Sequence, residues 1–113
     1  MTKRSIVTII TNILGERVVI TRQSLDHAKE THFEFLPEYI VLEFIERILK
    51  EPTVLYEESL RDEKKYNFFY KIEKTRFVVV VVKITSDGAF FASMYPTGSS
   101  VRPKHKKLKK VKL

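Results

Sequence analysis

One uninterrupted apolar run limits the fold of this chain more than any other feature. Residues 77–82 read Phe-Val-Val-Val-Val-Val, and a basic residue, Arg76 or Lys83, stands at each end. Successive side chains of a β-strand point to opposite faces of its sheet, so a strand whose two sets of side chains are both apolar must be covered on both faces. A run this short and this rich in valine is typical of a buried strand. We therefore expect residues 76–84 to form the central strand of a sheet.

Three more segments are predicted to form strands beside it, in the order of an antiparallel meander. They are residues 53–57, 66–72 and 89–95. Asp87 and Gly88 separate the last segment from the valine run, and an Asp-Gly pair favours a tight hairpin because Gly accepts a positive φ. In the middle segment the side chains of Tyr66, Phe68 and Tyr70 alternate, so we expect them to share one face.

Two helices are predicted before the meander. Residues 38–50 lie between Pro37 and Pro52, and apolar residues recur there at helical spacing, at Val41, Phe44, Ile45 and Ile48. A shorter and mostly polar helix, capped by Thr21 or Ser24, is expected to end near His32. The predicted fold class is therefore α+β, with two N-terminal helices packed on a four-stranded antiparallel sheet.

The N-terminal segment is expected to add a strand or a hairpin to this core, because residues 6–14 and 17–20 are rich in β-branched side chains and Gly15 permits a turn between them.

Positive charge is concentrated at one end of the chain. The 113 residues include 21 Lys and Arg against 14 Asp and Glu, a net charge of +7, and residues 102–113 hold seven of the basic residues and no acidic one. Residues 1–101 then form a neutral domain and residues 102–113 a basic tail. Such a block attracts polyanions, either nucleic acid or an anionic membrane. The tail has no amphipathic helix, which favours nucleic acid.

The composition argues against several classes of protein. The chain has no cysteine, which rules out disulfides and thiol chemistry and fits a cytoplasmic location. With three glycines it has no glycine-rich phosphate loop. Its apolar runs are far shorter than the roughly 20 residues that cross a bilayer, so we expect no membrane partner. We also expect no metal or other cofactor.

The residues best suited to acid–base chemistry are histidines, because only their side chains normally titrate near neutral pH. The chain has three, His27, His32 and His105. His27 and His32 lie about 140° apart around a helix and miss the spacing of a helical metal pair. Ser93 and Tyr95 point the same way from the last strand, where their hydroxyls could hold a phosphate.

Each of these residues also has a plain structural interpretation. His32 could interact with the C-terminal end of its helix and pack on a neighbouring phenylalanine. His27 could simply be solvated, and Ser93 and Tyr95 could belong to an ordinary half-exposed strand face. The residue types alone leave these alternatives open.

Short motifs resemble one group of nucleases. The segments that carry the resemblance are Val18-Val19-Ile20-Thr21, His27-Ala28-Lys29-Glu30-Thr31-His32, the helix that ends at Glu51-Pro52, and Ser93-Met94-Tyr95. They are similar to the phage and mobile-element branch of the fold shared by barnase, the EndoU nucleases, the E- and D-type colicin nuclease domains and the RelE toxins (the BECR fold). The similarity spans residues 17–97, with Phe33 where that group usually has proline and Ser93 where threonine is frequent.

The resemblance implies metal-independent cleavage of RNA. In that reaction a base takes the proton of the ribose 2′-hydroxyl, and an acid protonates the departing 5′-oxygen. It implies His27 as the base or acid, Ser93 and Tyr95 as groups that place the phosphate, and His32 and Arg22 as further catalytic candidates. The expected nucleic-acid-binding residues are Lys29, Arg102, Lys104, His105, Lys106 and Lys107.

The partners implied by this reading are RNA and a cognate antitoxin or immunity protein. Two alternatives remain open from the sequence. One is a non-catalytic module that holds RNA or a ribosomal surface with the basic tail and the face of Tyr66, Phe68 and Tyr70. The other is an accessory protein of a mobile element that binds another protein.

Overall fold

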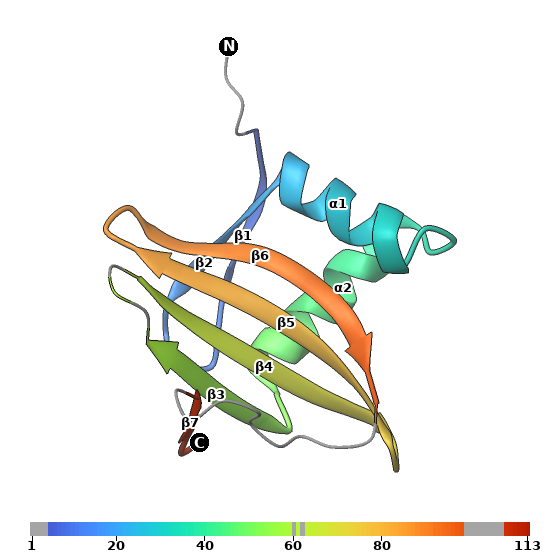
Figure 1. Ribbon diagram of the computed structural model, residues 1–113. Helices are drawn as coiled ribbons and strands as arrows, with labels where there is room; N and C mark the ends of the chain where they lie inside the picture. The colour runs from blue at the N-terminus through green and yellow to red at the C-terminus, as the bar shows by residue number, and fades with distance from the viewer. Residues whose placement is uncertain (1–4, 60, 62, 99–107) are drawn as a thin grey trace.

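Seven strands form one mixed sheet in the computed structural model, which describes residues 5–59, 61, 63–98 and 108–113 (Figure 1). In chain order the elements are β1 (Ile6–Thr11), β2 (Arg17–Thr21), α1 (Arg22–His32), α2 (Glu38–Lys50), β3 (Val54–Ser59), β4 (Lys64–Glu73), β5 (Arg76–Thr85), β6 (Gly88–Thr97) and β7 (Leu108–Val111). The strand order is β1-β2-β6-β5-β4-β3-β7. Neighbouring strands are antiparallel except β2 and β6, which are parallel.

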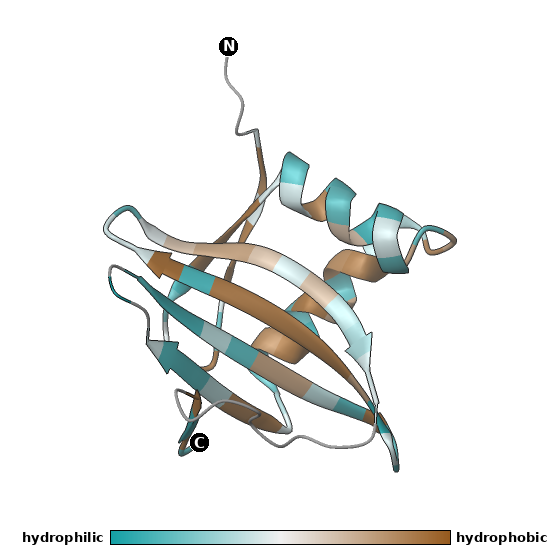
Figure 2. Cartoon of the chain, viewed as in Figure 1, coloured by the Kyte–Doolittle hydropathy of each residue, from teal (hydrophilic) through white to brown (hydrophobic). Residues whose placement is uncertain are grey.

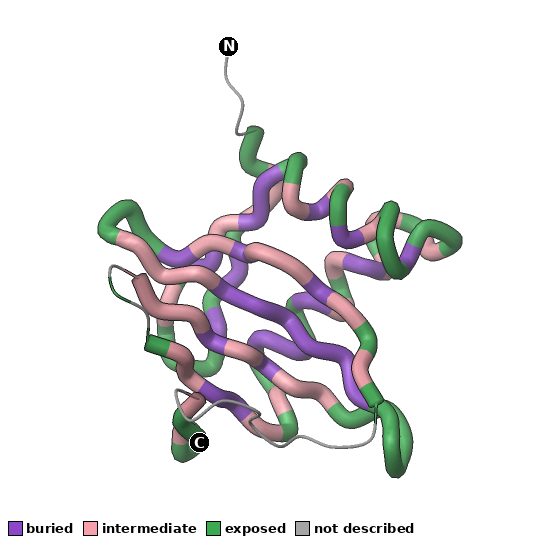
Figure 3. Tube along the Cα trace, in the orientation of Figure 1, coloured by how far each residue is buried: buried purple, intermediate pink, exposed green. Residues whose placement is uncertain are grey.

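The valine strand β5 lies in the middle of the sheet, as the sequence predicted. Val78, Val80 and Val82 belong to the main hydrophobic core, while Val79 and Val81 are buried on the other face. Figure 3 shows this burial as a continuous purple stretch along β5. Both faces of β5 are therefore covered, which accounts for a strand without alternation.

The helix α2 supplies much of the core on one face of the sheet. Its buried residues are Val41, Ile45, Ile48 and Leu49. Figure 2 shows hydrophobic residues on α2 and along β5, whereas α1 is mainly hydrophilic. The helix α1 begins at Thr21, whose side chain accepts a hydrogen bond from the Ser24 N–H at 3.3 Å, and it buries Leu25 and Ala28. No helix in the described part of the chain is long and apolar enough to cross a membrane.

The expected arrangement of two helices on a four-stranded antiparallel sheet is wrong. The four-stranded meander β3 to β6 is present, but it is extended at both edges. The N-terminal hairpin joins through β2, which pairs with β6, and Val18 and Ile20 of β2 are fully buried there. At the opposite edge β7 pairs with β3.

The strand β7 comes from the segment expected to be a basic tail. Its Val111 packs against the core, and Lys109 lies opposite Glu57 of β3 in the strand register. Opposite charges on facing strands favour pairing, although the Glu57 carboxylate forms its ion pair with Lys64 at 3.6 Å. The rest of the expected tail, residues 102–107, lies outside the described residues.

Candidate functional site

The helix α1 runs beside the second half of β6. The strand β2 pairs with β6 only where Val18 and Val19 lie opposite Ala89 and Phe90. The chain then turns at Thr21 into α1, which packs against β6. Along the rest of β6 the neighbour on this side is thus the helix α1. The site residues predicted on α1 and on β6 therefore lie on adjacent elements.

The C-terminal end of α1 brings His32 to Tyr95. The centres of the two rings are 6.5 Å apart, with an angle of 50° between their planes. The ring of His32 also meets Phe33 edge to face at 6.1 Å. In β6, Tyr95 and Ser93 lie on one face, and Met94 between them points into the core. His32 and Tyr95 are therefore the predicted site residues that the fold places in direct contact.

The environment of Tyr95 keeps its phenol protonated. Burial raises the pKa of Tyr95 above its usual value of 10.0, and the negative charge of Glu58 raises it further. Both effects disfavour the phenolate. At neutral pH the hydroxyl of Tyr95 is thus a hydrogen-bond donor beside an imidazole.

His27 opens onto a separate groove of about 620 Å³. This groove is also lined by Gln23, Ser24, Asp26, Glu30 and Ala92. Tyr95 does not line it, so this groove does not bring together His27 and Tyr95, which the resemblance assigns to one reaction. Ser93 follows Ala92 in the chain and shares a strand face with Tyr95, but it is not among the residues that line the groove. The register of β5 and β6 shifts between Val81 and Val82, and this bulge lies at Ala92.

A second groove, of about 400 Å³, shares Gln23, Ser24 and Ala92 with the first and reaches Lys83 of β5. The Nζ atom of Lys83 is 3.5 Å from a carboxylate oxygen of Glu63. Lys83 was not among the predicted site residues. The alternation of side chains along β5 could have indicated Lys83, because odd-numbered residues of this strand lie on the face away from the main core.

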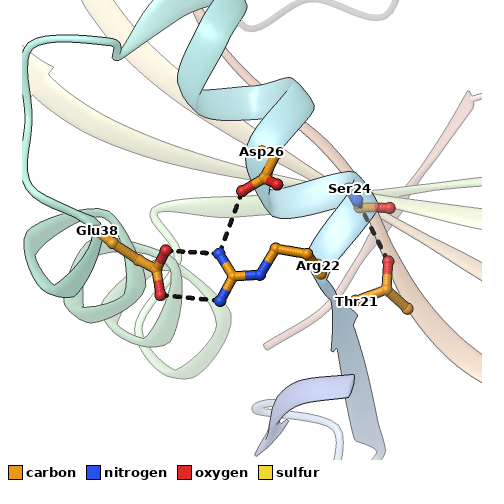
Figure 4. Close-up of polar contacts among 5 residues, drawn as sticks. All are labelled: Thr21, Arg22, Ser24, Asp26 and Glu38. Carbon is orange, nitrogen blue, oxygen red and sulfur yellow. Dashed lines mark hydrogen bonds and ion pairs between the residues drawn. The ribbon is translucent and has the colours of Figure 1, made fainter. Parts of the chain in front are cut away.

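Arg22 is held by two carboxylates. Its Nη1 donates hydrogen bonds to Glu38 at 2.6 Å and to Asp26 at 3.2 Å, and its Nη2 donates to the second oxygen of Glu38 at 3.3 Å (Figure 4). These contacts raise the pKa of Arg22 and lower that of Glu38. Arg22 thus ties the start of α1 to the start of α2, and its charge is already offset by two carboxylates.

The predicted nucleic-acid-binding residues are described only in part. Lys29 is half-buried on α1, and its charge contributes to the lowered pKa of Glu38. Arg102, Lys104, His105, Lys106 and Lys107 lie outside the described residues. Lys109 and Lys110 belong to β7, which β3, β4 and β5 separate from β6. The described part of the basic segment therefore lies at the edge of the sheet remote from α1.

The aromatic face proposed for a binding module points into the core. Tyr66 and Phe68 are buried in the main cluster, and Tyr70 packs edge to face on Phe44 of α2 at 6.0 Å. The prediction that Tyr66, Phe68 and Tyr70 hold RNA is wrong for this reason. Within the described ranges, no group of three or more His, Asp or Glu side chains could hold a metal ion.

Comparison with known proteins gives no match to a family model, to a curated protein or to a solved structure. The resemblance of residues 17–97 to nucleases therefore stays a prediction. The geometry between α1 and β6 is what remains to argue from.

Proposed function

We propose that this chain is a metal-independent endoribonuclease whose site lies between α1 and β6. The observation that carries the proposal is that the rings of His32 and Tyr95 lie side by side, with their centres 6.5 Å apart. An imidazole can exchange a proton near neutral pH, and a protonated phenol beside it can donate a hydrogen bond to a phosphate oxygen. These are two of the functions that RNA cleavage through the 2′-hydroxyl requires.

The second histidine supplies the other half of the acid–base pair. His32 follows His27 by five positions, which gives a rise of about 7.5 Å and a rotation of about 140° along α1. In the proposed reaction one imidazole takes the 2′-hydroxyl proton while the 2′-oxygen attacks phosphorus. The bond from phosphorus to the 5′-oxygen breaks, and the other histidine gives that oxygen a proton. Ser93 lies on the same face of β6 as Tyr95. Both hydroxyls donate hydrogen bonds to the phosphate.

Electrostatics also support a polyanionic substrate. The net charge of +7, which residues 102–113 carry, attracts RNA to the chain as a whole. Lys83 lines the groove that continues from His27 and is the described cation best placed to meet a phosphate there. Asp26, which borders the first groove, is partly neutralised by Arg22 at 3.2 Å.

The test is cleavage of end-labelled RNA by the purified chain in excess EDTA. We expect products that end in a 2′,3′-cyclic phosphate. General acid–base catalysis contributes about 10²–10⁴-fold, so His27→Ala and His32→Ala should each lower the rate by that factor with an unchanged melting temperature. Tyr95→Phe should lower it less, and the matched control Tyr39→Phe, on the exposed face of α2, should leave it unchanged.

Cleavage at the original rate in the double variant His27→Ala, His32→Ala would refute the proposal. A salt-sensitive gel shift of the intact RNA without cleavage would also refute it and would indicate a non-catalytic RNA-binding module. The absence of both cleavage and binding would leave the protein-binding alternative.

A further inference from the structure

The outer edge of β1 is an unprotected strand edge. β1 is the first strand in the sheet order and has no partner on its outer side within the residues described. Its sequence, IVTIIT, contains no charge, proline or glycine. Proteins usually guard such edges with lysine or proline because the unpaired N–H and C=O groups can pair with another strand. The opposite edge strand, β7, has two lysines among its four residues, so only β1 lacks this protection.

Exposed apolar side chains gather at the same place. Eight large hydrophobic residues are exposed in the described part of the chain, and half of them lie in β1 or the turn that follows it. These four are Ile6, Ile9, Ile13 and Leu14, with exposed fractions of 59%, 40%, 43% and 38%. Exposed apolar side chains concentrated along one edge strand and the turn after it are a feature of interaction sites.

The helix α2 lines the groove beside this edge. The groove has a volume of about 400 Å³ and is bounded by β1 on one side and by Leu42, Glu43, Glu46 and Lys50 on the other. The charges on this side of α2 are ordered, with acidic residues first and Lys50 at the C-terminal end. Glu46 and Lys50 form an ion pair at 3.1 Å.

We propose that β1 pairs antiparallel with β1 of a second copy of this chain, about a two-fold axis near Ile9. If the axis also passes midway between Glu43 and Lys50, it reverses α2 in the second copy and places Glu43 of each chain opposite Lys50 of the other. This charge complementarity favours a second copy over an unrelated strand. A two-fold axis also makes every contact occur twice, as in most homodimers.

The strand register is compatible with this axis. Residues directly opposite each other in an antiparallel pair have their side chains on the same face. Centring the pair on Ile9 places Ile9 against its own copy, and Thr8 lies opposite Ile10 of the second chain. Stable interfaces bury about 800 Å² per partner, which is roughly a tenth of the 7364 Å² surface of this chain.

This interface is independent of the proposed nuclease site. The strand β2 lies between β1 and β6, so pairing at β1 leaves the grooves between α1 and β6 open. Dimerisation and RNA cleavage can therefore be tested separately.

The test is the mass of the full chain in solution, measured by sedimentation over a range of concentrations. We expect twice the 13.3 kDa of one chain. Ile9→Lys should raise the dimer dissociation constant at least 10-fold, because it places two lysines against each other on the axis. Ile72→Lys is the matched control, since Ile72 is 50% exposed in β4 and away from the interface.

Charge exchange tests the orientation. Glu43→Lys and Lys50→Glu should each weaken the dimer, and the double variant should restore it because the pair is rebuilt with reversed charges. Hydrogen exchange of wild-type chain provides a readout that needs no variant, since the β1 amides should become more protected as the concentration rises. A chain that stays monomeric up to about 0.5 mM, well above typical dissociation constants, would overturn the proposal. So would a dimer unchanged by Ile9→Lys, a double variant as weak as the single ones, or β1 amides with concentration-independent exchange.

Discussion

Replacing Asn12 tests whether one buried amide holds the hairpin that presents β1. Asn12 is 4% exposed and lies in the turn between β1 and β2. Its Oδ1 accepts hydrogen bonds from the backbone N–H groups of Leu14 and Glu16, each at 2.9 Å, and its Nδ2 donates to the Glu16 carboxylate at 3.0 Å. Asn12→Ala removes all three bonds and leaves the backbone bonds of the turn in place.

The expected loss follows from these three bonds. Each contributes about 0.5–1.5 kcal/mol net, and water can replace part of the loss in an exposed turn, so Asn12→Ala should lower the free energy of unfolding by about 2 kcal/mol. For a domain of this size that corresponds to a melting temperature lower by about 8 °C. Glu16→Ala removes only the bond from Nδ2, so its cost should stay below about 1 kcal/mol.

Urea unfolding followed by circular dichroism measures these differences, with the slope m unchanged. Asn67→Ala is the matched control, because Asn67 is half-buried in β4 and its side chain has no hydrogen bond to the residues the structure describes. It should change stability by no more than about 0.5 kcal/mol. If Asn12→Ala is no more destabilising than Asn67→Ala, the amide does not hold the turn and the reasoning fails.

Three further predictions concern stability. The pKa values of Tyr66 and Tyr95 are raised, so the folded chain retains phenol protons that the unfolded chain releases. The free energy of unfolding should therefore fall as the pH rises above 10.0. In alkaline unfolding titrations, Tyr95→Phe should make that fall less steep. Gly88 has φ +129°, so Gly88→Ala should cost about 1–2 kcal/mol in urea unfolding; Gly98→Ala, where φ is not positive, should cost less. Phe68→Ala, at a fully buried position, should cost about 3–5 kcal/mol, and a melting temperature near that of wild type would contradict the packing described.

Features set by local pattern could be predicted from the sequence. The doubly apolar run gave β5 its central position, and the spacing of Val41, Ile45 and Ile48 located α2 between Pro37 and Pro52. Helical and strand periodicities are properties of neighbouring residues, so they need no knowledge of the rest of the fold.

Features set by distant contacts could not be predicted. The alternation of Tyr66 and Phe68 showed that they share a face but not that this face meets the helices. Nothing near Lys109 indicates a strand, because the stabilising partner Glu57 is far away in the sequence. The contacts of β7 were missed in this way, so no strand was expected on the outer side of β3.

The candidate site was predicted in its residue types and less well in its geometry. Which side of α1 faces β6 depends on where β2 stops pairing, and the sequence does not show that point. His27 was therefore favoured over His32, although His32 is the histidine that contacts Tyr95. The acidic partner of Arg22 on α2, Glu38, was missed for the same reason.

The parallel joint between β2 and β6 has a consequence for the order of folding. This parallel pairing places Val18 opposite Ala89, which is 71 positions later in the sequence, whereas short turns join β4, β5 and β6. Closing a long loop costs more entropy than closing a short one, and contacts of large sequence separation slow folding. We expect the meander to assemble first and to act as the template on which β2 docks. The space between α1 and β6 then takes shape only in the last step, so a slow phase in which α1 packs after the sheet signal has recovered would be its kinetic signature.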